Sequence, residues 1–114
     1  MSGSAFIEGA DKVERAAAEL HERTRALVAV VVATREQRRA DAPIAQMVAD
    51  AVALGAVTAR RAVEDAWRAY AASVSELRAA TVRMLVDETG MTFTDVARVL
   101  GISRQMASRL YASS

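Results

Sequence analysis

The C-terminal segment, residues 93–114, carries four side chains that could hydrogen-bond to the edges of nucleic-acid bases. They are Arg104, Gln105, Ser108 and Arg109. At 3.6 residues per turn these positions share one face of a helix, and the first two lie in its opening turn. Arginine can donate two hydrogen bonds to guanine, and glutamine can pair in the same manner with adenine. We therefore interpret this face as a candidate surface for reading double-stranded DNA.

Four further side chains are placed where a phosphate backbone could be held. Hydroxyl groups and unpaired N–H groups at helix N-termini suit phosphate oxygens, and arginine adds charge. The candidates are Thr92, Thr94, Arg98 and Ser103. The whole chain has a formal net charge of only +1, but residues 93–114 hold three arginines against one aspartate. Positive charge is thus concentrated at the C-terminal end.

Two short helices would position these side chains. Thr92 and Asp95 have the spacing of a capping box, which predicts a helix over Phe93–Leu100. Gly101 can adopt the left-handed conformation of a tight turn, and Ser103 can cap a second helix from Arg104 to about Tyr111. The residues expected to face inward are Val96, Ala97, Leu100, Ile102, Ala107 and Leu110.

The segment "TGMTFTDVARVLGISRQMASRLY" resembles the helix-turn-helix of bacterial and phage regulators. It is similar to units of transcriptional repressors, sigma-factor region 4 and the C-terminal domains of resolvases. The resemblance implies a tri-helical DNA-binding fold over residues 73–114, with Arg104, Gln105, Ser108 and Arg109 in the major groove. Two positions depart from the family: Ala107 stands where many members have Val or Ile, and Phe93 replaces a polar residue.

The N-terminal part shows a seven-residue repeat typical of a packed helix. Two positions of the repeat lie on the packed face. One position holds Phe6, Val13, Leu20, Leu27 and Thr34, and the other holds Ala10, Ala17, Thr24 and Val31. We expect a helix from Ala5 or Gly9 to Ala40. Its apolar stretch Ala26–Ala33 is far shorter than the roughly 20 residues of a membrane helix. The sequence therefore predicts that this stretch is buried on all sides.

Two more helices are expected between these regions. The second covers Pro43–Leu54, with Asp41 as its cap and Gly55 as its stop. The third begins near Thr58 and ends before Gly90, and a break near residues 73–75 is left open. Residues 48–63 faintly resemble a second helix-turn-helix, but the register fails there and an ordinary helix connection is expected.

The predicted fold class is therefore all-α: a long helical arm or bundle followed by a C-terminal tri-helical unit. Residues 1–72 form a helical dimerisation or bundle region, and residues 73–114, continuous with the preceding long helix, form the DNA-binding region. The expected dimer contacts are Val13, Leu20, Leu27, Val31, Trp67 and Tyr70. Packing of the seam within one chain and packing between chains remain equally open at this stage.

Several function classes lose support from the composition. The chain has no cysteine and a single histidine, His21, so no metal site is expected. No catalytic constellation or phosphate-binding glycine loop is present, so we expect neither enzymatic activity nor a cofactor. The first residues lack the pattern of a signal peptide and no membrane segment is expected, which favours a cytoplasmic protein.

These observations converge on a homodimeric DNA-binding protein, which we expect to be a bacterial or phage transcriptional repressor. Its partner would be double-stranded DNA with an inverted-repeat operator, and a regulatory protein could control it. It would be cytoplasmic and associated with the nucleoid when bound. The alternative is a helical interaction module, such as an antitoxin or adaptor, whose C-terminal hairpin is structural.

Overall fold

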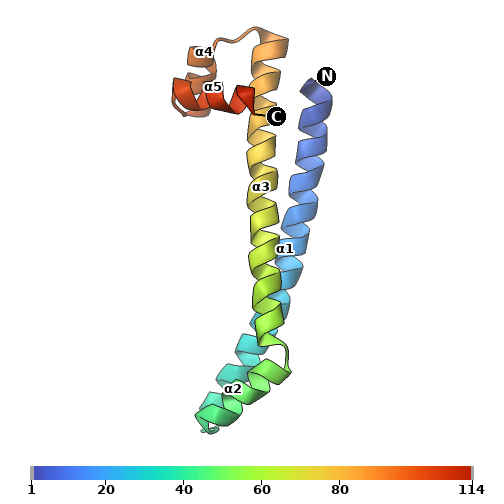
Figure 1. Ribbon diagram of the computed structural model, residues 1–114, viewed down its shortest axis with the longest axis vertical. Helices are drawn as coiled ribbons and strands as arrows, with labels where there is room; N and C mark the ends of the chain where they lie inside the picture. Colours follow the sequence, from blue (N-terminus) through green and yellow to red (C-terminus); the bar gives the residue numbers. More distant parts are fainter. Residues whose placement is uncertain (1, 114) are drawn as a thin grey trace. The chain divides into compact units, whose positions relative to one another are not determined.

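The computed structural model describes residues 2–113, and every element in this range is a helix (Figure 1). The five helices are α1 (Ser2–Arg39), α2 (Ile44–Ala53), α3 (Ala56–Thr89), α4 (Phe93–Leu100) and α5 (Arg104–Ala112). No strand occurs in the described residues. The expected all-α class is confirmed.

The chain separates into two packing units. The terminal unit contains residues 2–15 and 71–113, and the central unit contains residues 16–70. Helices α1 and α3 contribute to both. The predicted boundary between residues 72 and 73 lies close to the point where α3 passes from one unit to the other. Residues 2–15, however, pack with the C-terminal residues.

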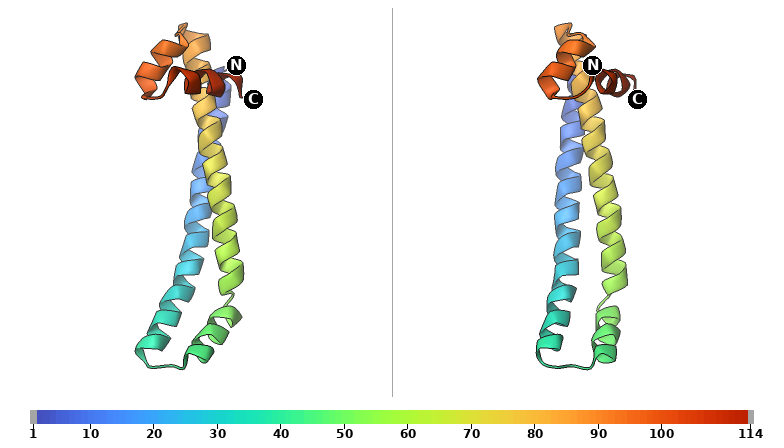
Figure 2. Two further views of the ribbon diagram at one scale, coloured as in Figure 1. Left: turned by 60° about the vertical axis from the view of Figure 1, so that its left-hand side comes forward. Right: turned by 90° about the vertical axis from the view of Figure 1, so that its left-hand side faces the viewer.

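The terminal unit is organised around three fully buried side chains, Val82 of α3, Val96 of α4 and Ala107 of α5. Half-buried apolar side chains surround them: Leu85, Val86, Met91, Phe93, Ile102, Leu110 and Tyr111. The start of α1 runs beside α3 (Figure 2). Gly9 permits the close approach, because a Cβ there would lie 3.3 Å from Leu77 Cδ1. Burial of these side chains fixes α4 and α5 on α3.

The central unit pairs α1 and α3 in antiparallel directions, with α2 continuing in the direction of α3 (Figure 2). Gln37 Nε2 donates to Asp50 Oδ2 at 2.6 Å, which links α1 to α2. Of residues 16–70 only Ala66 is buried. Within the described residues no helix combines the length and hydropathy needed to span a membrane.

The prediction that residues 26–33 are buried on all sides is wrong. Val28 is 50% exposed, Val31 is 57% exposed, and Val32 is also exposed. The line Leu20, Leu27 and Thr34 is half-buried, whereas Ala17, Thr24 and Val31 are exposed. The physical reason is that helices cover α1 on one side alone within this unit.

Several helix ends differ from those expected. α1 begins at Ser2 and α3 at Ala56, and α3 continues unbroken through residues 73–75. Asp41 does not cap α2: its φ of 58° places it in the preceding turn, and Pro43 occupies the N-cap with no side-chain hydrogen bond. Leu54 and Gly55 make the connection to α3.

Candidate nucleic-acid interface

The start of α4 is closed by the predicted capping box, which is confirmed. Thr92 N donates to Asp95 Oδ2 and Asp95 N donates to Thr92 Oγ1, each at 3.2 Å. The pKa of Asp95 lies below its usual value, and the main cause is the hydrogen bond with the Thr92 backbone. The hydrogen bond with the Thr92 side chain is the second cause. Arg98 lies 3.8 Å from the same carboxylate and adds to this effect. The cap defines where α4 begins.

The turn between α4 and α5 also has the expected chemistry. Gly101 is left-handed, with φ 68° and ψ 34°, and Ile102 N donates to the carbonyl of Ala97 at 3.0 Å. Ser103 Oγ then accepts from Met106 N at 2.9 Å, which caps α5. A side chain at position 101 would strain this conformation, so glycine suits the turn.

The inner face of α5 is anchored in the core by Ala107, which is fully buried with Val82 and Val96. Small size at this position lets α5 lie close to its neighbours, so alanine suits the site. Leu100, which was expected to face inward, is less covered than the other inward residues, with 39% of its surface exposed. It lies in the last turn of α4 at the rim of a hollow of about 260 Å³, which Ile102 and Leu110 also line.

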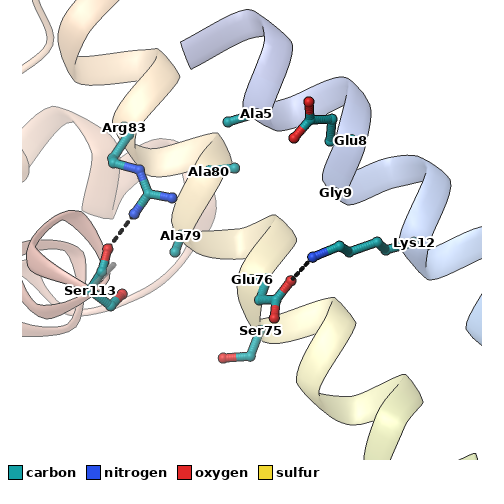
Figure 3. Close-up of a pocket in the computed structure, with 10 residues that line it drawn as sticks. All are labelled: Ala5, Glu8, Gly9, Lys12, Ser75, Glu76, Ala79, Ala80, Arg83 and Ser113. Atoms are coloured by element: carbon teal, nitrogen blue, oxygen red, sulfur yellow. Dashed lines mark hydrogen bonds and ion pairs between the residues drawn. The ribbon is translucent and has the colours of Figure 1, made fainter. Parts of the chain in front are cut away.

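The C-terminal end of α5 is tied to α3 by contacts that the sequence did not reveal. Tyr111 Oη donates to Asp87 Oδ1 at 2.8 Å, and this bond raises the pKa of Tyr111. The Phe93 and Tyr111 ring centroids lie 5.6 Å apart. Arg83 Nη1 donates to the carbonyl of Ser113 (Figure 3). These contacts fix the C-terminal end of α5.

A hollow of about 440 Å³ lies within the terminal unit, between α1 and α3 (Figure 3). Small residues of the two helices border it, including Gly9, Ala79 and Ala80. Lys12 Nζ lies 3.3 Å from Glu76 Oε2 across it. Since this pair joins α1 to α3 and Arg83 joins α3 to Ser113, the charged groups of the hollow brace the unit that carries α5.

The four candidate base-reading side chains, Arg104, Gln105, Ser108 and Arg109, are all exposed on α5. Arg109 Nη2 lies 3.6 Å from Met106 Sδ, and within residues 2–113 the other three form no hydrogen bond or ion pair. The structure thus brings them to one solvent-facing side, opposite Ala107. Their hydrogen-bonding groups are available to an external partner.

The four candidate phosphate contacts, Thr92, Thr94, Arg98 and Ser103, are exposed as well. Thr92 and Ser103 use their hydroxyl oxygens as acceptors for the caps, which leaves the hydroxyl hydrogens free to donate to an anion. Arg98 keeps most of its side chain in solvent beside Asp95. Its guanidinium can therefore exchange the carboxylate for a phosphate at low cost.

Comparison of the chain with protein-family models, with curated proteins and with solved structures yields no match. Among the described residues no group of three or more His, Cys, Asp or Glu side chains is arranged to hold a metal ion. The functional interpretation therefore depends on the geometry of α4 and α5 themselves.

Proposed function

We propose that the protein is a sequence-specific double-stranded DNA-binding protein, a homodimeric transcriptional repressor that reads the major groove with α5. One observation carries this proposal. α5 is held in a core by Ala107 on one face and presents Arg104, Gln105, Ser108 and Arg109 to solvent on the other. A rigid helix with arginine and glutamine on its free face suits base edges.

The succession of elements supports the same function. A capped α4, a left-handed Gly101 and a capped α5, packed on the end of α3, correspond to the parts of a helix-turn-helix with its preceding helix. In this arrangement the first turn of the second helix meets base edges. Arg104 and Gln105 occupy that turn, and Ser108 and Arg109 follow one turn later.

The phosphate contacts would come from the two helix starts. Exposed hydroxyls and the first N–H groups of α4 and α5 suit phosphate oxygens, and Arg98 supplies charge. One short helix makes few base contacts, so two copies acting together would be needed for tight binding. Two such helices about 34 Å apart would read an inverted repeat on one side of the duplex. The protein would then act in the cytoplasm, on the nucleoid, without a cofactor or enzymatic activity.

Selection of binding sites from random duplex DNA at fixed salt tests the proposal. The wild type should enrich an inverted repeat, and the Arg104→Ala/Arg109→Ala variant should not. Each lost arginine–guanine pair costs about 1–3 kcal/mol, so the double variant should bind the selected site at least roughly 30-fold more weakly.

A matched control separates base reading from loss of charge. Arg25 and Arg61 are exposed and belong to the central unit. The Arg25→Ala/Arg61→Ala variant also loses two positive charges, and it should keep most of the affinity for the selected site. Equal losses in both double variants, with both proteins folded, would mean that the binding is not specific.

The alternative function is a helical interaction module. It is favoured by the exposed apolar side chains of the central unit, such as Val48 and Trp67, which a protein partner could cover. Under this alternative Arg104 and Arg109 are ordinary surface residues, and the wild type enriches no DNA sequence although it is fully folded.

A further inference from the structure

Six of the nine large exposed apolar side chains of the central unit are turned to one flank of its helices, whereas Leu54 and Val57 are not and Val32 lies farther round α1. On α1 the half-buried line Leu20, Leu27 and Thr34 marks the direction of the neighbouring helices. Val31 follows Leu27 by four residues, and Val28 follows it by one. At 100° per residue, both are therefore turned from that line in the same sense. They emerge on one flank of the helix.

The other two helices show a displacement in the same sense. On α2 the half-buried positions are Met47, Asp50 and Ala51, and the exposed Ile44, Val48 and Val52 are turned from them by roughly 60–140°. On α3 Trp67 is turned by roughly 80° from the half-buried line around Val63, Ala66 and Tyr70. α2 and α3 run antiparallel to α1 (Figure 2). On antiparallel helices that face each other, side chains turned from the facing line in the same sense along each chain emerge on the same side, so all of these side chains lie on one side of the unit.

The opposite side of the central unit has a different composition. The corresponding positions there are small or polar: Glu22 and Ala29 on α1, Gln46 and Ala49 on α2, and Asp65 and Ala69 on α3. All six positions are exposed. The unit is therefore amphipathic as a whole. We call the flank with Val28, Val31, Ile44, Val48, Val52 and Trp67 the apolar side.

The apolar side is large for the surface of a single chain. The six side chains are 50–67% exposed. Counting roughly 100 Å² for each aliphatic chain and somewhat more for the indole, they present about 600 Å² of apolar surface. This is at the upper end of the range for the largest apolar patch on a monomer, against the roughly 800 Å² that each partner contributes to a standard interface.

The pattern of the surface favours a second copy of this chain as the occupant. Residues 16–70 carry eight arginines against seven acidic residues, so their net charge of +1 opposes self-association little. Ala17, Thr24 and Val31 repeat every seven residues on the exposed flank of α1, and the two small ones let another helix approach. A two-fold axis would lay this side against itself, as in most homodimers.

We propose that the apolar side of the central unit binds the same side of a second copy, forming a bundle from the helices of both chains. The proposal deepens the proposed function, because it rests on the need there for two copies and names the surface that joins them. Val31 and Trp67 belong to this interface. Leu20 and Leu27, also expected as dimer contacts from the sequence, instead pack mainly within one chain.

Sedimentation equilibrium over a range of concentrations tests the interface with matched pairs of substitutions, one or two positions apart on the same helix. Val48→Glu and Trp67→Glu alter the apolar side, and Ala49→Glu and Ala69→Glu place the same charge on the opposite side of the same helices. The wild type and the two alanine-derived variants should sediment as dimers. The two apolar-side variants should sediment at the mass of one chain, with a dissociation constant raised at least tenfold and an unchanged helical circular-dichroism spectrum.

The possible results are distinct. A wild type that stays monomeric at about 100 µM overturns the proposal and leaves the apolar side to another occupant. Apolar-side variants that remain dimeric also overturn it. Where a glutamate variant loses helix, Val48→Ser and Trp67→Ser replace it in the same comparison. If the protein is a dimer but selects no DNA sequence, the proposed function is wrong and the proposed interface is supported. If the protein is a monomer that binds DNA through Arg104, the proposed interface is wrong and the DNA-binding function is supported.

Discussion

The terminal and central units contain similar amounts of helix, but they bury their side chains very differently. The terminal unit closes a core over Val82, Val96 and Ala107, each with no exposed surface. The central unit buries only Ala66 and exposes Val48, Trp67 and other large apolar side chains. One unit is therefore stabilised by its own side chains, whereas the other leaves much apolar surface in water.

Helix ends show the same contrast. α4 and α5 begin at side-chain caps, Thr92 with Asp95 and Ser103, and Tyr111 ties the end of α5 to Asp87. α2 begins at Pro43 without a side-chain cap. Precise closure of the terminal unit suits a rigid surface that must match a ligand. The central unit is suited to an association that supplies the missing burial.

The largest expected difference between the units concerns valine truncation. Val96→Ala removes two buried methyl groups, so we expect it to lower the free energy of unfolding by about 2–3 kcal/mol. Val48→Ala removes the same atoms from an exposed position, 58% accessible, and should change the stability of a monomeric Trp67→Glu background by less than about 0.5 kcal/mol. Urea unfolding followed by circular dichroism measures both. Equal losses of unfolding free energy for the two variants would contradict the difference in burial between the units.

The next effect concerns the caps. Thr92→Ala removes the acceptor for Asp95 N and should cost about 1 kcal/mol of stability. Asp41→Asn keeps a residue type that tolerates the left-handed conformation and removes only a charge, so it should cost less than about 0.5 kcal/mol. Thermal unfolding of the two variants distinguishes them. A larger loss for Asp41→Asn would show that this carboxylate has a structural partner.

The smallest effect is the response to pH at two helix ends of the terminal unit, the start of α4 and the end of α5. The pKa of Asp95 is lowered in the folded chain, so the stability it adds is present above its ordinary pKa and is lost as the pH falls through the folded value. The pKa of Tyr111 is raised, so its contribution is present below its ordinary pKa and is lost as the pH rises through the folded value.

Nuclear magnetic resonance can follow both ends separately. The Thr92 amide signal should shift on the acid side in the wild type but not in Asp95→Asn, and the methyl signals of Leu110 on α5 should shift on the alkaline side but not in Tyr111→Phe. Both changes should be small, because the two groups are exposed. An acid-side shift that persists in Asp95→Asn would assign the titration to a different group.

Local signals could be predicted from the sequence, and contacts between distant residues could not. Thr92, Asp95, Gly101 and Ser103 lie within a few positions of the backbone groups they satisfy, so their spacing was sufficient to predict both caps and the turn. Asp87 and Tyr111 are 24 residues apart, and Arg83 and Ser113 are 30 apart. No pattern within one helix indicates such pairs.

Burial failed as a prediction for a related reason. The apolar stretch at residues 26–33 has the composition of a helix that is buried on all sides. Composition, however, gives no information about how many neighbouring helices are present to cover it. In one chain α1 has neighbours on one side alone, so Val28 and Val31 remain exposed.

Trp67 has a practical consequence as the single indole of the chain. It is 58% exposed, on the apolar side, with the Tyr70 ring centroid 6.0 Å from its own. Indole emission moves to shorter wavelengths when water is excluded from the ring. Its fluorescence therefore reports whether this flank is covered, without an added label and at nanomolar dilution. Emission from the two tyrosines, Tyr70 and Tyr111, does not interfere when excitation is confined to the indole band.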